Sequence, residues 1–376
     1  MNNIIKWRRW FHEHPELAFS EYNTSKFIKE TLDRWNISWR GWGDTALTAE
    51  IGEGDASIAI RTDMDALPIN EENDIPYRSK YNNKMHACGH DGHMAILLGL
   101  IERLKEKENI FSQKIVFIFQ PAEEIGEGAK FLIDKGIIDY YNIKKIIGFH
   151  LFASLPRGTI GARSGVIMAE GDKFIVEIEA KGSHGATPWL SNDVVAISTS
   201  YVQALFSNFL RRFSPLSKQV ILSIGKFHGG DAFNIIPQKL QIEGTIRSLS
   251  RDKRVEFIEK LKDFTNRFIA SLEGKVNIKI DRVFPAVVND HRLYSILKDI
   301  IITSNFKFLE VIPTTISEDF SFFTEHIPGI YFFIGIRNEE KGIIYPHHHP
   351  RFNIDEDMLV PSVDLLNTLV LKLLNV

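Results

Sequence analysis

Short, almost wholly apolar runs alternate with helical stretches along the first 170 residues of the chain. The runs cover residues 57–61, 114–119 and 145–149, and residues 329–335 near the far end have the same character. Such runs are typical of strands that are buried on both faces of a mostly parallel sheet. The pattern therefore predicts an α/β layer architecture.

A helix is expected between the first two of these strands. Over residues 91–105, apolar side chains recur at the three- and four-residue spacing of one helix face, and they are Met94, Leu97, Leu98, Ile101 and Leu104. This spacing predicts an amphipathic helix that packs against the sheet.

A different pattern fills residues 172–288. It predicts in order a strand, a helix, two strands, a helix and a strand, at residues 173–181, 193–213, 219–227, 240–249, 251–272 and 276–283. This βαββαβ order is that of a ferredoxin-like α+β domain. Residues 241–247 alternate between apolar and polar, so one sheet face is expected to be covered and the other open, which suits a dimer contact.

After Asn289 the pattern of helices and buried strands resumes. We therefore expect residues 1–171 and 289–376 to form one domain, into which residues 172–288 are inserted. A chain of 376 residues is long enough for two domains.

The composition narrows the class of protein. Hydrophobic residues make up 44% and charged residues 25%, with a net charge of -3, so no positive field attracts nucleic acid or an anionic membrane. The apolar runs fall short of the roughly 20 residues of a membrane helix, and the amino terminus lacks a signal-peptide apolar region. We expect a cytoplasmic protein that binds neither nucleic acid nor membranes. Cys88 is the only cysteine, which excludes an intrachain disulfide.

Metal-capable side chains follow three of the expected strands. Because ligand sites of open α/β sheets lie beyond the carboxyl ends of the strands, these side chains should meet in one crevice. They are Asp63 and Asp65 after the first run, Glu123 and Glu124 after the second, and His150 after the third. The loop of residues 85–93, which leads into the expected helix, adds a cysteine and three histidines.

Cys88 and His90 are two residues apart in a loop that contains glycine, so a thiolate and an imidazole can face one cation such as zinc. Glu124 can supply an oxygen ligand, which leaves Glu123 free as a base. The segment of residues 347–349 adds three further imidazoles.

Other interpretations of these residues remain open. Cys88 could be a small buried hydrophobe, or a nucleophile with His86 or His90 as its base. The aspartates could cap a turn, the glutamates could lie at a solvated helix start, and at least one tail histidine is expected to be solvated. Five histidines have no second ligand type nearby and are interpreted as surface or core residues: His12, His14, His228, His291 and His326. His184 lies in a tight loop, residues 182–189, that could present it to the crevice.

Seven segments together resemble the metal-dependent N-acyl-amino-acid amidohydrolases, the hippurate hydrolase family within the aminoacylase and zinc carboxypeptidase superfamily. They are RTDMDALPI (61–69), MHACGHDGHMA (85–95), QPAEE (120–124), GSHGATPW (182–189), NIIP (234–237), SEDFSFF (317–323) and HHHPRFNIDE (347–356). They span nearly the whole chain in the family's order.

The resemblance implies a site for two divalent metal ions (Zn, Mn, Co or Ni), held by Cys88, His90, Glu124, His150 and His348. His348 is chosen among the tail histidines because family members carry the ligand two places before the proline. The resemblance also implies Glu123 as general base, Asp65 as a carboxylate that orients a ligand, and His184 as a lid residue that reaches a neighbouring subunit. The inserted domain would then be a lid and would join two copies as a homodimer.

The function implied is hydrolysis of the amide bond of a small N-acyl amino acid, with N-acetyl and N-benzoyl conjugates as examples. A water activated by metal would attack the amide, with Glu123 as its base. Two alternatives remain: a metal-dependent carboxypeptidase or dipeptidase, and a catalytically silent member that only binds metal or ligand. Trp189 stands where many members have a histidine, which we connect with substrate choice.

Overall fold

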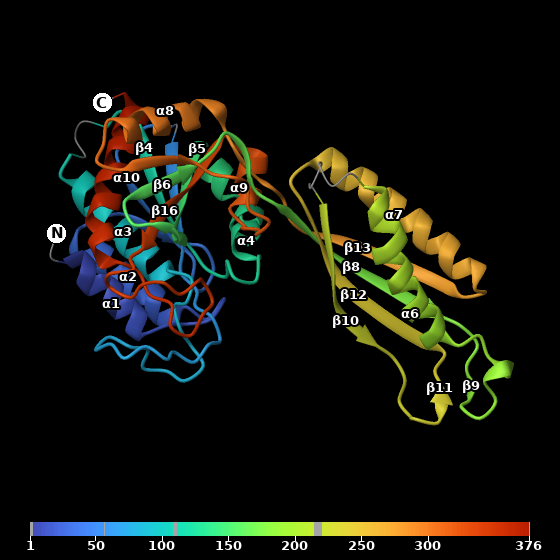
Figure 1. Ribbon diagram of the computed structural model, residues 1–376. Coiled ribbons are helices and arrows are strands. Elements are labelled where there is room, and N and C mark those ends of the chain that lie inside the picture. The colour runs from blue at the N-terminus through green and yellow to red at the C-terminus, as the bar shows by residue number, and fades with distance from the viewer. Residues whose placement is uncertain (1–2, 56, 108–110, 214–219, 376) are drawn as a thin grey trace. The chain divides into compact units, whose positions relative to one another are not determined.

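The computed structural model describes residues 3–55, 57–107, 111–213 and 220–375. The chain divides into two units (Figure 1). The first comprises Met1–Ile167, Val287–Ile312 and Glu318–Val376, and the second comprises Met168–Ala286 and Pro313–Ser317. Both units are therefore built from segments that are distant in sequence.

An eight-stranded sheet forms the centre of the first unit. Its strands in spatial order are β1 (Trp39–Gly41), β2 (Leu47–Ile51), β4 (Lys114–Gln120), β3 (Ser57–Asp63), β5 (Ile143–Pro156), β16 (Gly329–Arg337), β6 (Thr159–Ala162) and β15 (Lys307–Glu310). The four central strands β4, β3, β5 and β16 are parallel to one another. The prediction of an α/β fold with a large, mostly parallel sheet is confirmed.

Helices cover this sheet (Figure 1). They are α1 (Asn3–Glu13), α2 (Tyr22–Arg34), α3 (His90–Lys105), α4 (Gly128–Asp134), α5 (Ile137–Tyr140), α8 (His291–Ile302), α9 (Ser321–His326) and α10 (Leu359–Leu374). α3 packs against β3, β4 and β5, while α1 and α10 pack on α3. α3 is consequently buried over most of its surface, beyond the single apolar stripe that its spacing predicts.

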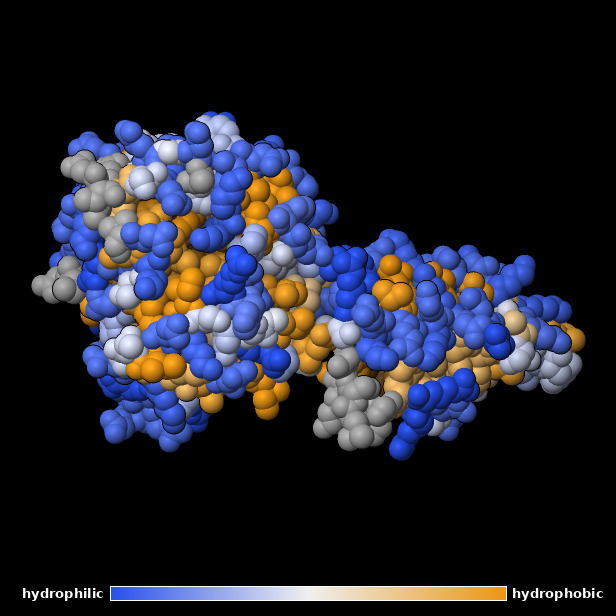
Figure 2. Space-filling view, turned by 90° about the horizontal axis from the view of Figure 1, so that it is seen from above, coloured by the Kyte–Doolittle hydropathy of each residue, from blue (hydrophilic) through white to orange (hydrophobic). Residues whose placement is uncertain are grey.

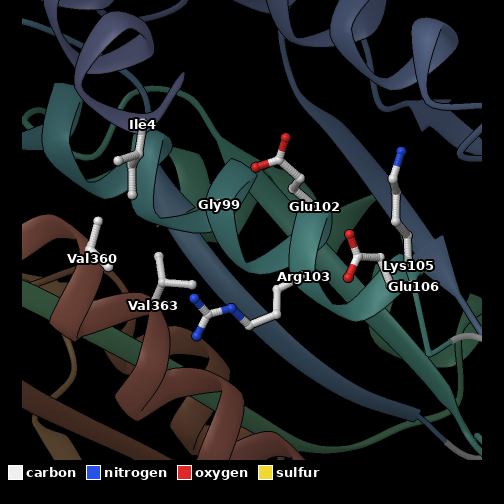
Figure 3. A pocket seen from close by; sticks show the side chains of 8 residues that line it. All are labelled: Ile4, Gly99, Glu102, Arg103, Lys105, Glu106, Val360 and Val363. Atoms are coloured by element: carbon white, nitrogen blue, oxygen red, sulfur yellow. The ribbon is translucent and has the colours of Figure 1, made fainter. Parts of the chain in front are cut away.

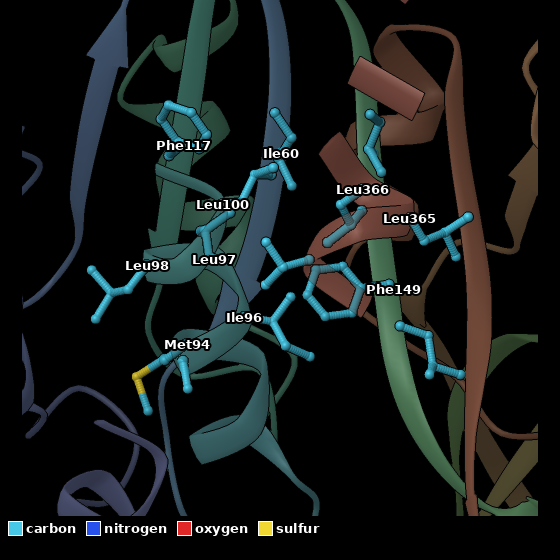
Figure 4. Close-up of a cluster of buried hydrophobic side chains, with 14 of the residues drawn as sticks. Ile60, Met94, Ile96, Leu97, Leu98, Leu100, Phe117, Phe149, Leu365 and Leu366 are labelled. Carbon is cyan, nitrogen blue, oxygen red and sulfur yellow. The ribbon is translucent and has the colours of Figure 1, made fainter. Parts of the chain in front are cut away.

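The core of the first unit lies between the sheet and these helices. Figure 4 shows Leu97 and Leu100 of α3 beside Ile60 of β3 and Phe117 of β4. All four side chains have no exposed surface. This packing fixes the start of α3, which carries His90, relative to the ends of the strands.

β5 is longer than its apolar run indicates, so the expectation that His150 follows the strand is wrong. Pairing with β3 ends at Gly148, but pairing with β16 continues from His150 to Pro156. His150 therefore lies beyond the last residue of β5 that pairs with β3. Apolarity along the chain marks only the part of β5 that has a strand on both sides.

The second unit contains a four-stranded antiparallel sheet and two helices. Along the chain its elements are β8 (Glu170–Glu179), α6 (Val194–Ala204), β10 (Val220–His228), β12 (Lys239–Ser248), α7 (Arg251–Ser271) and β13 (Lys275–Phe284). The strand order is β10-β12-β8-β13. α6 ends at Ala204, nine residues before Phe213, the expected end of this helix, because the chain continues as a π turn over Leu205–Phe209 and a 3-10 turn over Leu210–Arg212. Gln219, the expected start of a strand, lies outside the described residues.

Side chains alternate across β8. Phe174, Val176 and Ile178 are buried in the core beneath α6 and α7, whereas Lys173 and Glu177 lie on the other face. That second face is polar and carries cross-strand ion pairs such as Lys173 with Glu243. Figure 2 shows hydrophilic residues over much of the visible surface, interrupted by apolar patches.

Residues 313–317, which we expected in the larger domain, group with the second unit. The amide of Ala169 donates to the carbonyls of Thr314 and Ile316 at 3.1 Å each, and the Ser317 hydroxyl donates to the Ala169 carbonyl at 2.8 Å.

Two short ladders complete the fold: β7 (Gly165–Met168) pairs with β14 (Val287–Asn289), and β9 (Ser183–His184) pairs with β11 (Ile235–Ile236). None of the described helices is long and apolar enough to span a membrane.

Candidate metal centre

The loop before α3 places Cys88 and His90 on either side of a glycine. Gly89 is the residue before the helix and has a φ of 92°, a left-handed conformation that L side chains rarely adopt. This turn allows Cys88 in the loop and His90 in the first turn of α3 to face the same point.

The structure brings the five side chains predicted as metal ligands into overlapping groups. The ligand atoms of Cys88, His90 and His150 lie within 4.8 Å of one another, as do those of Cys88, Glu124 and His348. Cys88 Sγ is 3.4 Å from His150 Nε2, and Glu124 Oε1 is 3.9 Å from His90 Nε2. Sulfur, nitrogen and oxygen atoms therefore converge at one place.

Backbone carbonyls orient two of the imidazoles. His90 donates from Nδ1 to the Asp65 carbonyl at 2.9 Å, and His150 donates from Nδ1 to the Leu151 carbonyl at 2.8 Å. Each ring then presents an Nε2 lone pair toward Cys88 or Glu124. A carbonyl partner on the second nitrogen is the usual arrangement for a histidine that binds metal.

His93 lies close to these rings but is fully engaged. Its Nε2 accepts from the Leu151 amide at 2.9 Å, so its Nδ1 carries the proton and donates to Asp63 Oδ1 at 2.7 Å. Neither nitrogen is left for a metal ion, and His93 ties β3, β5 and α3 together.

The three tail histidines differ in their contacts. His347 donates from Nε2 to the Leu151 carbonyl at 2.9 Å, and His349 stacks on the Tyr345 ring. His348 places Nε2 at 3.4 Å from Glu124 Oε2, and its φ of 63° is uncommon for a residue other than glycine. Among the described tail histidines, His348 is the one grouped with Cys88 and Glu124.

Asp65 organises the two glutamates. Its Oδ1 and Oδ2 accept from the amides of Glu123 and Glu124, at 3.0 Å each. With its carbonyl on His90, Asp65 therefore contacts three of the residues that the sequence singles out. The Asp65 side chain, which is 1% exposed, thus holds the two glutamates through their backbone amides.

The centre has an excess of buried acidic groups. Burial raises the pKa of Glu124 to about 7, and burial together with Glu124 raises the pKa of the Cys88 thiol. Burial lowers the pKa of His90, but the charges of Asp63, Asp65 and Glu124 outweigh it and raise this pKa to about 10. A positive charge at this place is therefore strongly favoured.

The remaining histidines lie elsewhere. His184 belongs to β9 of the second unit, is exposed, and accepts at Nδ1 from the Ala186 amide at 3.1 Å. His12 is a core residue held between Asp91 and Glu71, at 2.8 and 3.0 Å, and His14 is half-buried. The others on the surface are His228, His291 and His326.

The sequence analysis missed a buried ion cluster beside Glu123. Arg61 pairs with Asp63, Glu318 and Asp319 at 3.0, 3.1 and 2.6 Å. Arg61 belongs to the RTDMDALPI segment and the two acids to SEDFSFF, and no feature of either segment predicts that they meet.

A surface pocket of about 430 Å³ lies between α1, α3 and α10 of the first unit (Figure 3). It is lined by Ile4, Gly99, Glu102, Arg103, Lys105, Glu106, Val360 and Val363. This lining contains no thiol or imidazole, so the pocket is not a second metal centre of the same kind.

A family model described as peptidase family M20/M25/M40 matches residues 59–372. The chain belongs to this peptidase family. It is thus an enzyme of a group of metal-dependent amidohydrolases and peptidases.

Relatives in other organisms align with nearly the whole of this chain. Thermostable carboxypeptidase 1 of Saccharolobus solfataricus is 39% identical over 95% of this chain and 91% of its own length. N-acetyl-L-cysteine deacetylase of Bacillus subtilis is 37% identical over 96% of this chain and 85% of its own. The crystal structure of the Bacillus subtilis YXEP protein, described as a dinuclear metal binding peptidase from this family, has a TM-score of 0.88 at 30% identity and covers 100% of this chain and 98% of that one.

Proposed function

We propose that the protein hydrolyses the amide bond of N-acyl amino acids, such as N-acetyl or N-benzoyl conjugates, and releases a carboxylic acid and a free amino acid. The observation that carries this proposal is the convergence of Cys88, His90, Glu124, His150 and His348 next to Glu123. The relative named N-acetyl-L-cysteine deacetylase supports it.

The residues fit two divalent metal ions. His90 Nε2 and Glu124 Oε1 are buried and make no hydrogen bond, an arrangement that costs free energy unless a cation binds there. We propose that Cys88, His90, Glu124, His150 and His348 hold the ions, which would be Zn, Mn, Co or Ni. The mixed sulfur, nitrogen and oxygen donors suit such borderline ions.

Bound ions would lower the pKa of a water molecule and polarise the amide carbonyl. Glu123 would then take the proton from the attacking water and deliver it to the leaving nitrogen. Burial and the charge of Glu318 raise the pKa of Glu123, which suits a group that must hold a proton and release it again. Asp65 fixes the backbone from which the Glu123 side chain projects.

A metal-dependent carboxypeptidase that acts on short peptides is the second candidate. It is favoured by the relatives named thermostable carboxypeptidase, which are 39% identical. Both reactions release a free amine from an amide, so the same catalytic residues would serve either.

The deciding experiment combines metal analysis with detection of free amine. Purified protein is loaded with each divalent ion and offered N-acetyl, N-benzoyl and peptidyl amino acids, with and without chelator. Amine release from acyl amino acids that chelator abolishes would support the proposal, and faster release from peptides would favour the carboxypeptidase. Bound metal without release from any substrate would contradict both and indicate a silent binder.

We further propose that residues 172–288 form a ferredoxin-like lid and dimerisation domain, and that His184 of this domain stabilises the oxyanion in a neighbouring subunit. The order of its elements, βαββαβ, supports the domain type. A mixture of His184→Ala and Glu123→Gln proteins tests the role: activity should reappear only if subunits share sites. A monomeric mass by light scattering would contradict the dimer. We place the protein in the cytoplasm, which fractionation of cells would test.

A further inference from the structure

The buried ion cluster beside Glu123 enters the mechanism above only through the charge of Glu318, and the contacts of Arg61 have no role there. Carboxylate oxygens of Glu123, Glu318 and Asp319 lie within 4.8 Å of one another. Glu318 and Asp319 are 2% and 0% exposed. Three carboxyl groups this close are unfavourable unless a proton or a cation lies among them, and Arg61, 1% exposed, supplies a positive charge to Glu318 and Asp319.

Each nitrogen of the Arg61 guanidinium already has an acceptor. Nε donates to Gln120 Oε1 at 2.8 Å, and Nη1 donates to Asp63 Oδ2 at 3.0 Å. Nη2 donates to Asp319 Oδ1 at 2.6 Å and lies 3.1 Å from Glu318 Oε1. Glu123 is close enough to feel the charge of Arg61, but among the described contacts it makes no ion pair with this guanidinium.

Glu318 and Asp319 are themselves held rigidly. Glu318 accepts from the Tyr331 hydroxyl at 2.7 Å and from the Phe320 amide at 3.0 Å. Asp319 accepts from Gln120 Nε2 at 2.8 and 2.9 Å and from the Ala129 amide at 2.9 Å. Neither acid can move without breaking buried hydrogen bonds, which is costly.

We propose that Glu318 and Asp319 are positioning residues that occupy Arg61 and so prevent it from capturing the Glu123 carboxylate. A free guanidinium binds a carboxylate with two parallel hydrogen bonds. Such a pair would turn Glu123 away from the attacking water and make it a weaker base. This inference rests on the proposed role of Glu123 as the base.

Two variants at one position test the proposal. Glu318→Ala frees an N–H of Arg61, so kcat should fall about 10- to 100-fold, a large part of what a general base contributes. KM and bound metal should stay unchanged, because the five proposed ligands are untouched. Glu318→Gln keeps an oxygen that accepts from Arg61, so it should keep clearly more of its kcat than the alanine variant.

A crystal structure of the Glu318→Ala protein supplies a readout that is independent of activity. It should show Glu123 paired with Arg61. A wild-type kcat in Glu318→Ala, or equal losses in both variants with no contact between Glu123 and Arg61, would overturn the proposal. A loss explained entirely by lower metal content would do the same.

If the alanine variant does not fold, Tyr331→Phe removes only the hydroxyl that holds Glu318 Oε2. It should lower kcat several-fold at constant KM, and an unchanged kcat would count against the proposal. Glu123→Gln in the same assay distinguishes a failure of the proposed function from a failure of this inference. A metal-loaded wild type without activity contradicts the proposed function, whereas an active wild type, an inactive Glu123→Gln and an unaffected Glu318→Ala contradict this inference alone.

Discussion

Replacing Gly89 by alanine tests whether the left-handed turn between Cys88 and His90 holds these two proposed ligands in place. An added Cβ would lie 3.6 Å from Leu151 Cβ and 3.6 Å from Phe352 Cζ, which are ordinary contacts. The side chain therefore fits, and the cost comes from the backbone, whose φ is 92°. A left-handed conformation costs an L residue about 1–2 kcal/mol.

The chain can relieve this strain by turning the loop toward a right-handed conformation, which would move Cys88 away from His90. Because the metal-free loop can relax, its unfolding free energy should fall by less than the full strain of about 1–2 kcal/mol. Metal binding must restore the strained turn, so the dissociation constant for metal should rise about tenfold, as roughly 1.4 kcal/mol corresponds to a factor of ten. Urea denaturation of metal-free protein and competition with a chromophoric chelator measure the two quantities.

Gly136 offers a matched control. It precedes α5 with a φ of 82°, and an added Cβ would meet no atom within 4 Å. Gly136→Ala should therefore lose a similar free energy of unfolding while its metal affinity stays at the wild-type value. Equal metal affinities in both variants would refute the idea that the turn at Gly89 sets the spacing of the ligands.

Three further predictions concern single side chains. Glu123→Gln should abolish amine release and keep both metals, whereas Cys88→Ala should lose metal, and metal analysis beside the amine assay distinguishes them. His12 is buried, which lowers its pKa, but hydrogen bonds to Asp91 and Glu71 outweigh burial and raise this pKa above 6.5. Its protonated form therefore adds stability that is fully present below pH 6.5 and is lost as pH rises through the folded-state pKa. The difference in unfolding free energy between wild type and His12→Asn should shrink from pH 6 to pH 9, and a constant difference would contradict this sign.

The candidate residues of the centre could be recognised from the sequence because its motifs are local. Cys88 and His90 share a loop, and Glu123 and Glu124 are adjacent, so their residue types and spacing can be recognised in one short segment. The parallel sheet could be predicted as well, because strands buried on both faces are apolar at nearly every position.

Long-range pairing was beyond this kind of reasoning. Nothing near Arg61 indicates that Asp319, 258 residues away, will accept from its Nη2. The extent of β5 depends on its pairing with β16 rather than on its own apolarity. The difference between His347 and His348 likewise depends on the Leu151 carbonyl, which accepts from only the first of the two among the described contacts.

The position of β16 between β5 and β6 has a consequence for synthesis on the ribosome. β5 and β6 emerge early, but the strand that separates them begins at Gly329, and α10, which packs on α3, emerges later still. Until then the nascent chain carries two unpaired sheet edges, the kind of surface that promotes aggregation. The second unit can fold during this time, because it is one continuous segment, Met168–Ala286, except for residues Pro313–Ser317. A chain terminated before Gly329 would thus hold a folded second unit joined to a first unit that cannot close.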